Sequence, residues 1–172
     1  MVRLSAPVDR PLPSRRGILM AAGATLVVLV AGTPSGARAD DPSADALAFL
    51  QSIYGRYENG GPGIDRTEDG ILPTLFTPEL AAMIADDDAR AAADGEVPNL
   101  EADPFIDAQD GEIGPINVTI ADAPGGRMIG RASFTNSGEP KLIELVLIES
   151  SAGWRIEDIH WPEGTLRGLY SH

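Results

Sequence analysis

The sequence predicts an α+β protein in which two N-terminal helices pack on a curved, four-stranded antiparallel sheet. Two observations support this prediction. Apolar residues recur at helical spacing in two stretches of the first half, 47–57 and 80–84, whereas they alternate with polar residues in stretches of the second half. Short turn sequences separate the alternating stretches, so we expect consecutive strands to form an antiparallel meander.

The first 39 residues have the features of a cleaved export signal. Arginines precede an apolar run of sixteen residues, 17–32, and Ala37-Arg38-Ala39 supplies a small-residue cleavage site. The pair Arg15 and Arg16 favours the twin-arginine route, with the general secretory route left open. The apolar run is shorter than the roughly 20 residues of a spanning helix. We therefore expect residues 40–172 to form a single domain that is periplasmic or secreted, without a stable membrane anchor.

Residues 40–172 are strongly acidic. They carry 8 Lys and Arg against 25 Asp and Glu, a net charge of −17. Such a surface repels nucleic acid and anionic lipid, because both require clustered cations, and it favours a basic partner. The chain has no cysteine, which excludes disulfides, thiolate metal sites and cysteine nucleophiles.

The first helix is expected to begin after Asp40 with Ser43 as its N-cap. It buries one apolar stripe, and we expect the two tyrosines in this stripe to keep their hydroxyls in water. The members of the stripe are Leu47, Leu50, Ile53, Tyr54 and Tyr57.

The second helix is expected to begin at Thr77, a hydroxyl N-cap followed by Pro78, and to end at Gly95. Its acidic triplet, Asp86 to Asp88, points in directions about 100° apart, so these carboxylates cannot converge on one ion. We expect the triplet to be solvated.

Two acidic loops are candidates for calcium. Residues 65–76 partly match a calcium loop, but Phe76 replaces the glutamate that should stand at its twelfth position. Residues 101–112 bring Asp103, Gln109 and Asp110 together in one stretch, where Asp107 and Asp110 would share one side of a short helix. Two interpretations are open. In one, these side-chain oxygens bind a hard cation such as calcium. In the other, Asp103 caps a turn and a phenylalanine fills the core. The second interpretation is favoured, because Asp in loops usually binds local backbone.

Four strands follow, around residues 116–120, 128–135, 142–148 and 154–161. The third is apolar at almost every position, so we expect a central strand covered on both faces. In the fourth, the apolar parity changes between Ile156 and Ile159, which predicts a bulge near Glu157 and Asp158. The tail after the last strand is expected to add one helical turn.

Four segments carry a resemblance to a known family: Phe49–Tyr54, Leu80, Asp103–Phe105 with Ala108–Asp110, and Gly153–Ile156 with Asp158 and Ile159. They resemble an exported bacterial family of unknown function. That family is similar to the cystatin-like α+β cones, which include nuclear transport factor two and several small-molecule isomerases. The resemblance implies the fold and no activity, because this fold class hosts enzymes, scaffolds and binding modules.

The predicted function is a non-enzymatic binding module for a small molecule or a basic extracytoplasmic protein, without cofactor, metal or nucleic acid. Any site is expected where the hairpin of residues 140–161 faces the loop of residues 103–110. Two alternatives stay open: a calcium-stabilised acidic domain, and a small acid–base enzyme that uses a dry cone pocket. The catalytic residues of such an enzyme and the oligomeric state are left open. The candidate ligand-binding residues are Asp103, Gln109, Asp110, Arg131, Asp158 and His160.

Overall fold

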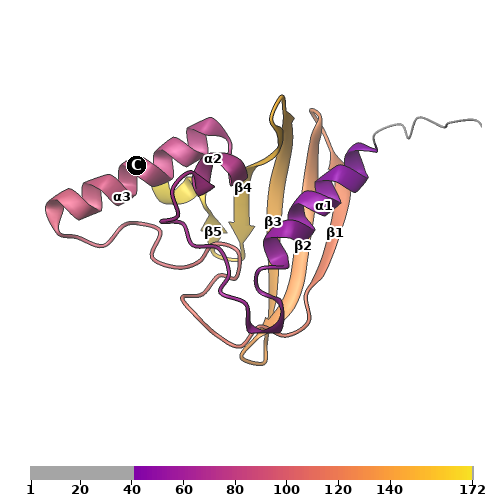
Figure 1. Ribbon diagram of the computed structural model, residues 1–172, viewed down its shortest axis with the longest axis horizontal. Helices are drawn as coiled ribbons and strands as arrows, with labels where there is room; N and C mark the ends of the chain where they lie inside the picture. The colour runs from indigo at the N-terminus through magenta and orange to yellow at the C-terminus, as the bar shows by residue number, and fades with distance from the viewer. Residues whose placement is uncertain (1–40, 172) are drawn as a thin grey trace, which may run out of the picture. The chain divides into compact units, whose positions relative to one another are not determined.

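The computed structural model describes residues 41–171, so the predicted export signal and its cleavage site lie outside the described residues. The helices come first and the sheet follows (Figure 1), which confirms the α+β class. The helical elements are α1 (Pro42–Tyr54), η1 (Glu58–Gly60), α2 (Ile71–Leu75), α3 (Pro78–Asp94) and η2 (Arg167–Tyr170). The strands are β1 (Asn117–Ala123), β2 (Arg127–Asn136), β3 (Glu139–Ser150), β4 (Gly153–Trp161) and β5 (Gly164–Thr165).

The sheet is an antiparallel meander in the order β1-β2-β3-β4-β5. The prediction of four strands is wrong by one, because β5 has two residues and therefore carries no periodic signal. The predicted bulge is confirmed. Val146 pairs with Asp158 and the next residue pairs with Ile156, so Glu157 has no partner across the ladder.

Only one of the predicted helices lies on a face of the sheet. Helix α1 crosses the face next to β1 and β2, whereas α3 lies beyond the β4 side of the sheet (Figure 1). The segment before α3 fixes this position, because Phe76 forms a parallel bridge with Ile156 and the Thr77 N–H donates to the Ile156 carbonyl at 2.9 Å. Within residues 41–171, no helix is long and apolar enough to cross a membrane.

The caps of the two long helices follow local chemistry. Helix α1 is capped by Asp41, whose carboxylate accepts the Ser43 N–H at 3.0 Å, and not by Ser43 as predicted. The helix begins earlier than predicted, because an aspartate followed by proline at the first helical position can also accept the unpaired N–H groups of the first turn. In α3 the predicted Thr77 N-cap and the left-handed Gly95 C-cap are both confirmed.

The hydrophobic core fills the space between α1 and one face of the sheet. Large side chains from α1, from α3, from the loops and from the strands are fully buried in the core, and the Tyr54 and Phe105 rings meet edge to face at 6.4 Å. Leu166, before η2, is also fully buried, so the predicted helical turn of the tail covers one end of the sheet. The largest fully buried side chains are Tyr54, Phe76, Phe105, Leu50, Ile53, Leu80, Ile84, Ile143, Leu145, Leu147, Ile156 and Ile159.

The opposite face of the sheet is mostly uncovered within residues 41–171. Strand β3 is central in the sheet, as predicted, but only one of its faces is buried. Leu142 on the other face is 49% exposed, and Val146 and Ile148 are half-buried. We call this surface the open face: Ile129, Arg131, Leu142, Glu144, Val146, Ile148, Asp158 and His160.

Candidate functional site

Asp103 is built into the core side of the protein as a cap. Its carboxylate accepts the Phe105 N–H at 2.9 Å and the Tyr57 hydroxyl at 2.7 Å. Burial raises the pKa of Asp103 above its ordinary value, and these two hydrogen bonds oppose that shift. The favoured interpretation is therefore confirmed: Asp103 caps a turn, and Phe105 lies in the core.

The two tyrosines of α1 and the following turn are buried, so the prediction that their hydroxyls meet water is wrong. The Tyr54 hydroxyl donates to the Phe105 carbonyl at 3.2 Å, and the Tyr57 hydroxyl accepts the Ile64 N–H at 3.1 Å. Burial raises the pKa of both phenols well above the usual range. The reason is tertiary, because the loop containing Asp103 folds against α1 and supplies acceptors that replace water.

The rest of the acidic loop does not form the predicted helix or a cluster of ligands. Asp107 adopts a left-handed conformation with φ of 51° and binds Lys141 at 2.7 Å, while Gln109 and Asp110 are exposed. Because the chain turns at Asp107, this residue and Asp110 do not share one helical side. Among the described residues, no group of three or more acidic or histidine side chains is arranged to hold a metal ion.

The acidic triplet of α3 is only partly solvated, which corrects the prediction. Asp87 is 2% exposed, and its carboxylate accepts the Asn99 N–H at 2.7 Å and the Asn99 side-chain amide at 2.6 Å. Asp88 lies 3.4 Å from Arg66. The bonds to Asn99 attach the segment after α3 to the helix, so the buried Asp87 carboxylate has a structural role.

The hairpin of β3 and β4 does meet the acidic loop, as predicted. The Trp161 indole N–H donates to the Pro104 carbonyl at 2.9 Å. Beside this contact lies a shallow hollow of about 250 Å³ whose lining includes Asp103, Asp107 and Trp161. Of the six candidate residues, only Asp103 belongs to it.

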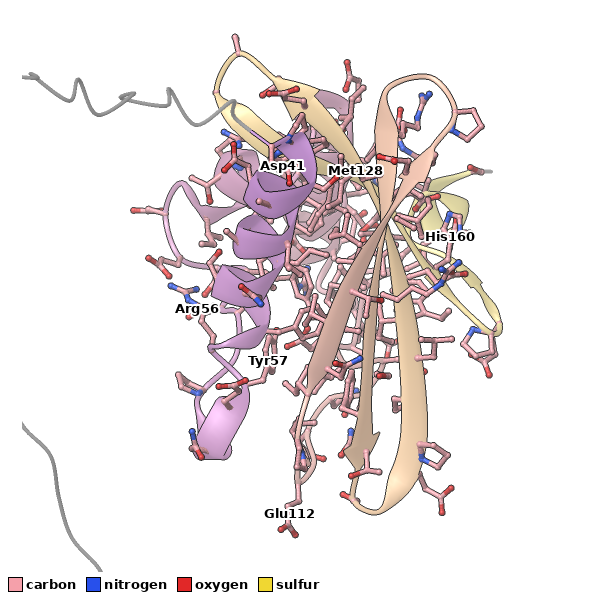
Figure 2. All side chains as sticks on the ribbon, turned by 90° about the vertical axis from the view of Figure 1, so that its right-hand side faces the viewer. Asp41, Arg56, Tyr57, Glu112, Met128 and His160 are labelled. Carbon is pink, nitrogen blue, oxygen red and sulfur yellow. The ribbon has the colours of Figure 1, made fainter. Side chains whose placement is uncertain are left out.

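Three other candidates gather on the open face. Figure 2 shows Tyr57 on the α1 side of the sheet and His160 on the opposite side. The Arg131 guanidinium lies 2.7 Å from the Glu144 carboxylate, and Glu144 stands opposite His160 in the ladder. The His160 ring lies 3.3 Å from the Asp158 carboxylate. Asp103 therefore lies on the core side, three candidates lie on the open face, and Gln109 and Asp110 are exposed in the loop. The six predicted residues do not form one site.

The open face deepens into a groove of about 630 Å³ beside the bulge of β4. Because Ile156 and Ile159 both enter the core, the two residues between them turn toward the groove. Val146 and Ile148 form its apolar part. The polar lining consists of Thr77, Glu79, Glu157, Asp158, His160 and Arg167.

Arg167 and Arg127 fix the polar wall of this groove. The Arg167 side chain donates to the Glu157 carbonyl at 2.7 Å, and its backbone N–H donates to the Asp158 carboxylate at 2.9 Å. Arg127 binds the Glu157 carboxylate through two nitrogens, one of them at 2.8 Å, and this contact lowers the pKa of Glu157. The sequence pattern missed Arg167 and Thr77, because both reach the groove only when the tail and α3 pack beside β4.

The groove is suited to binding more than to acid–base chemistry. The Asp158 carboxylate lies 3.3 Å from the His160 ring, but the imidazole is 43% exposed and lies on an open surface. Acid–base catalysis gains most of its advantage in a site that excludes water. The space that a cone pocket would occupy, between α1 and the sheet, is filled by core side chains.

No protein-family model matches the chain, and no curated protein is significantly similar to it. Two solved structures align with most of the chain. One is a chain of the type VI native effector–immunity complex Tae3–Tai3 from Ralstonia pickettii, with 20% identity, a TM-score of 0.48, and coverage of 71% of this chain and 95% of that chain. The other is a phospholipid-binding protein from Ralstonia solanacearum in complex with a phospholipid, with 20% identity, a TM-score of 0.30, and coverage of 75% and 60%. Similarities at this level assign neither a family nor an activity.

Proposed function

We propose that this protein is a non-enzymatic binding module that recognises a basic protein outside the cytoplasm through its open face. The observation that carries the proposal is the composition of the central strand. Of the four β3 side chains on the open face, Leu142, Val146 and Ile148 are apolar and only Glu144 is charged. The solvent-facing side of an antiparallel sheet normally carries polar residues. Contiguous exposed apolar surface on that side favours an interaction site.

The charge of the domain supports a basic partner. Residues 40–172 have a net charge of −17, which attracts cationic proteins and accelerates their association at low ionic strength. Two arginines of this side of the sheet are paired with acids, Arg127 with Glu157 and Arg131 with Glu144. The Arg167 side chain in the groove donates to the Glu157 carbonyl. At the groove, Glu79 makes no ion pair with any other residue from 41 to 171 and is therefore available to a cationic side chain.

A protein partner fits this surface better than a small ligand. The groove is open along the sheet, whereas sites for small molecules enclose most of the ligand. The interior is filled by residues such as Phe105 and Tyr54. An extracytoplasmic location follows from the predicted export signal and is part of the proposal.

The test is capture of the partner with immobilised residues 40–172 from the cell-envelope fraction of the source organism, followed by reconstitution with the purified partner. Leu142→Arg places a charge in the centre of the open face, and we expect it to weaken binding by about tenfold or more. Val97→Arg is the matched control, because it makes the same charge change at a 69% exposed valine after α3. Wild-type binding should also weaken as salt rises.

Equal weakening by the two arginine variants would show that only net charge matters, and unchanged binding by Leu142→Arg would remove the open face from the proposal. Circular dichroism of both variants checks that the fold is intact.

A further inference from the structure

Strand β1 forms one edge of the sheet, and its outer side has no partner within residues 41–171. Asn117–Ala123 pairs with β2 along its whole length, and no backbone hydrogen bond from any other described segment reaches it. In an antiparallel edge strand, the N–H and C=O groups of alternate residues point away from the sheet. β1 therefore presents a row of unpaired donors and acceptors along one side of the protein.

Most of this edge lacks the usual protection against strand addition. β1 contains no proline and no lysine, and its register with β2 has no bulge. Its one charged residue, Asp122, stands opposite buried Met128 near the end of the strand. Natural edge strands are normally blocked by one of these devices or kept very short. The opposite edge follows that rule, because β5 has two residues and η2 follows directly.

A groove runs beside the start of β1 on the side that carries α1. It consists of two hollows of about 370 Å³ and about 340 Å³, which share Glu58 and Ile116 and therefore lie next to each other. Figure 2 views the protein from this side, with α1 next to the edge of the sheet. We call it the edge groove: Gln51, Tyr54, Gly55, Glu58, Asn59, Ile113, Gly114, Pro115, Ile116, Asn117 and Val118.

The edge groove combines apolar and polar side chains and contains one negative charge. Ile113, Ile116 and Val118 are partly buried against the core and form its apolar part. Glu58 is its only charged residue, is exposed, and makes no ion pair with another described residue. The groove therefore favours an extended segment with apolar side chains and one cationic side chain.

We propose that an extended segment of a partner protein adds to β1 as a sixth strand. Its backbone pairs with the outer edge of β1, alternate apolar side chains enter the edge groove, and a lysine or arginine faces Glu58. A second copy of this chain is the less favourable occupant, because two domains of net charge −17 repel each other. This surface is distinct from the open face, so the inference does not depend on the proposed function.

The experiment selects peptides from a random heptapeptide library against residues 40–172 and measures the binding of synthetic hits by fluorescence anisotropy. We expect hits that alternate apolar residues and contain one lysine or arginine. Glu58→Gln should weaken their binding by about threefold, the effect of one exposed ion pair. Val118→Lys should weaken it by more than tenfold, because an inward-pointing lysine blocks the edge. Glu101→Gln, an exposed glutamate outside the edge groove, is the matched control.

Hydrogen exchange shows where on the protein a selected peptide binds. A bound hit should slow exchange of the outward amides of β1, in wild type and in Leu142→Arg alike. Three results would overturn the inference: no enriched sequence, hits that bind Val118→Lys as well as wild type, or protection that maps elsewhere. Sedimentation that shows a dimer, lost in Val118→Lys, would assign the edge to a second copy instead.

Discussion

Replacement of Tyr57 by phenylalanine tests the buried hydrogen bonds that hold the Asp103 loop on the core. The change removes one oxygen, which donates to the Asp103 carboxylate at 2.7 Å and accepts the Ile64 N–H at 3.1 Å. The buried Ile64 N–H is then left without an acceptor, and the half-buried Asp103 carboxylate loses one of its two donors, because the ring itself stays in place.

The expected cost follows from these two losses. A hydrogen bond to a charged group contributes about 1.5–3 kcal/mol, and an unsatisfied buried N–H costs about 1–3 kcal/mol. Partial hydration of the Asp103 side reduces the total, so we expect Tyr57→Phe to lower the free energy of unfolding by about 3 kcal/mol. For a domain of roughly 130 residues this corresponds to a fall in Tm of about 10 °C.

The pH dependence of stability gives a second expectation for the same pair. Because burial raises the pKa of Asp103, its contribution to stability is complete below the unfolded-state pKa of about 3.9 and is lost as pH rises through the folded-state pKa. Asp103→Asn does not titrate and keeps an acceptor for the Phe105 N–H. Its stability relative to wild type should therefore increase as pH rises from about 3.9 through the raised folded-state pKa of Asp103.

Urea unfolding followed by the fluorescence of the two tryptophans measures both effects. Tyr170→Phe is the matched control, because the Tyr170 hydroxyl is buried and has no hydrogen-bond partner among the described residues. It should change stability by less than about 0.5 kcal/mol. The reasoning is refuted if Tyr57→Phe and Tyr170→Phe cost the same, or if the stability difference between Asp103→Asn and wild type does not vary with pH.

Three further predictions concern the helices, the core and calcium. Asp87→Ala removes both hydrogen bonds to Asn99 and should lower the free energy of unfolding by about 2–3 kcal/mol in urea. The control Asp86→Ala, at an exposed position, should lower it by less than about 0.5 kcal/mol, and equal losses would contradict a structural role for Asp87. Gly130→Ala would place a methyl group 2.1 Å from a Leu50 methyl carbon and should lower stability by about 1–3 kcal/mol, and a neutral result would show that α1 shifts freely. Thermal melts with calcium and with a chelator should coincide, and a calcium-dependent rise in Tm would revive the calcium-stabilised alternative.

The sequence by itself determined the features that depend on neighbouring residues. Thr77 followed by proline begins α3 and Gly95 ends it, because the caps satisfy backbone groups within a few residues. The alternation in β2 and the parity change around Glu157 predicted the buried face and the bulge. In each case the physical cause acts within one turn of helix or along one strand.

The tertiary structure decided which surfaces are left for binding and which carboxylates are structural. Asp103 meets Tyr57 across 46 residues, and Asp87 meets Asn99 only after the chain leaves α3. The apolar run of β3 predicted cover on both faces, but α1 occupies one face and α3 lies beside β4, so no described element remains for the face of Leu142. The local sequence pattern indicates which side chains are apolar enough to be buried. Only the packed chain determines whether another element is available to cover them.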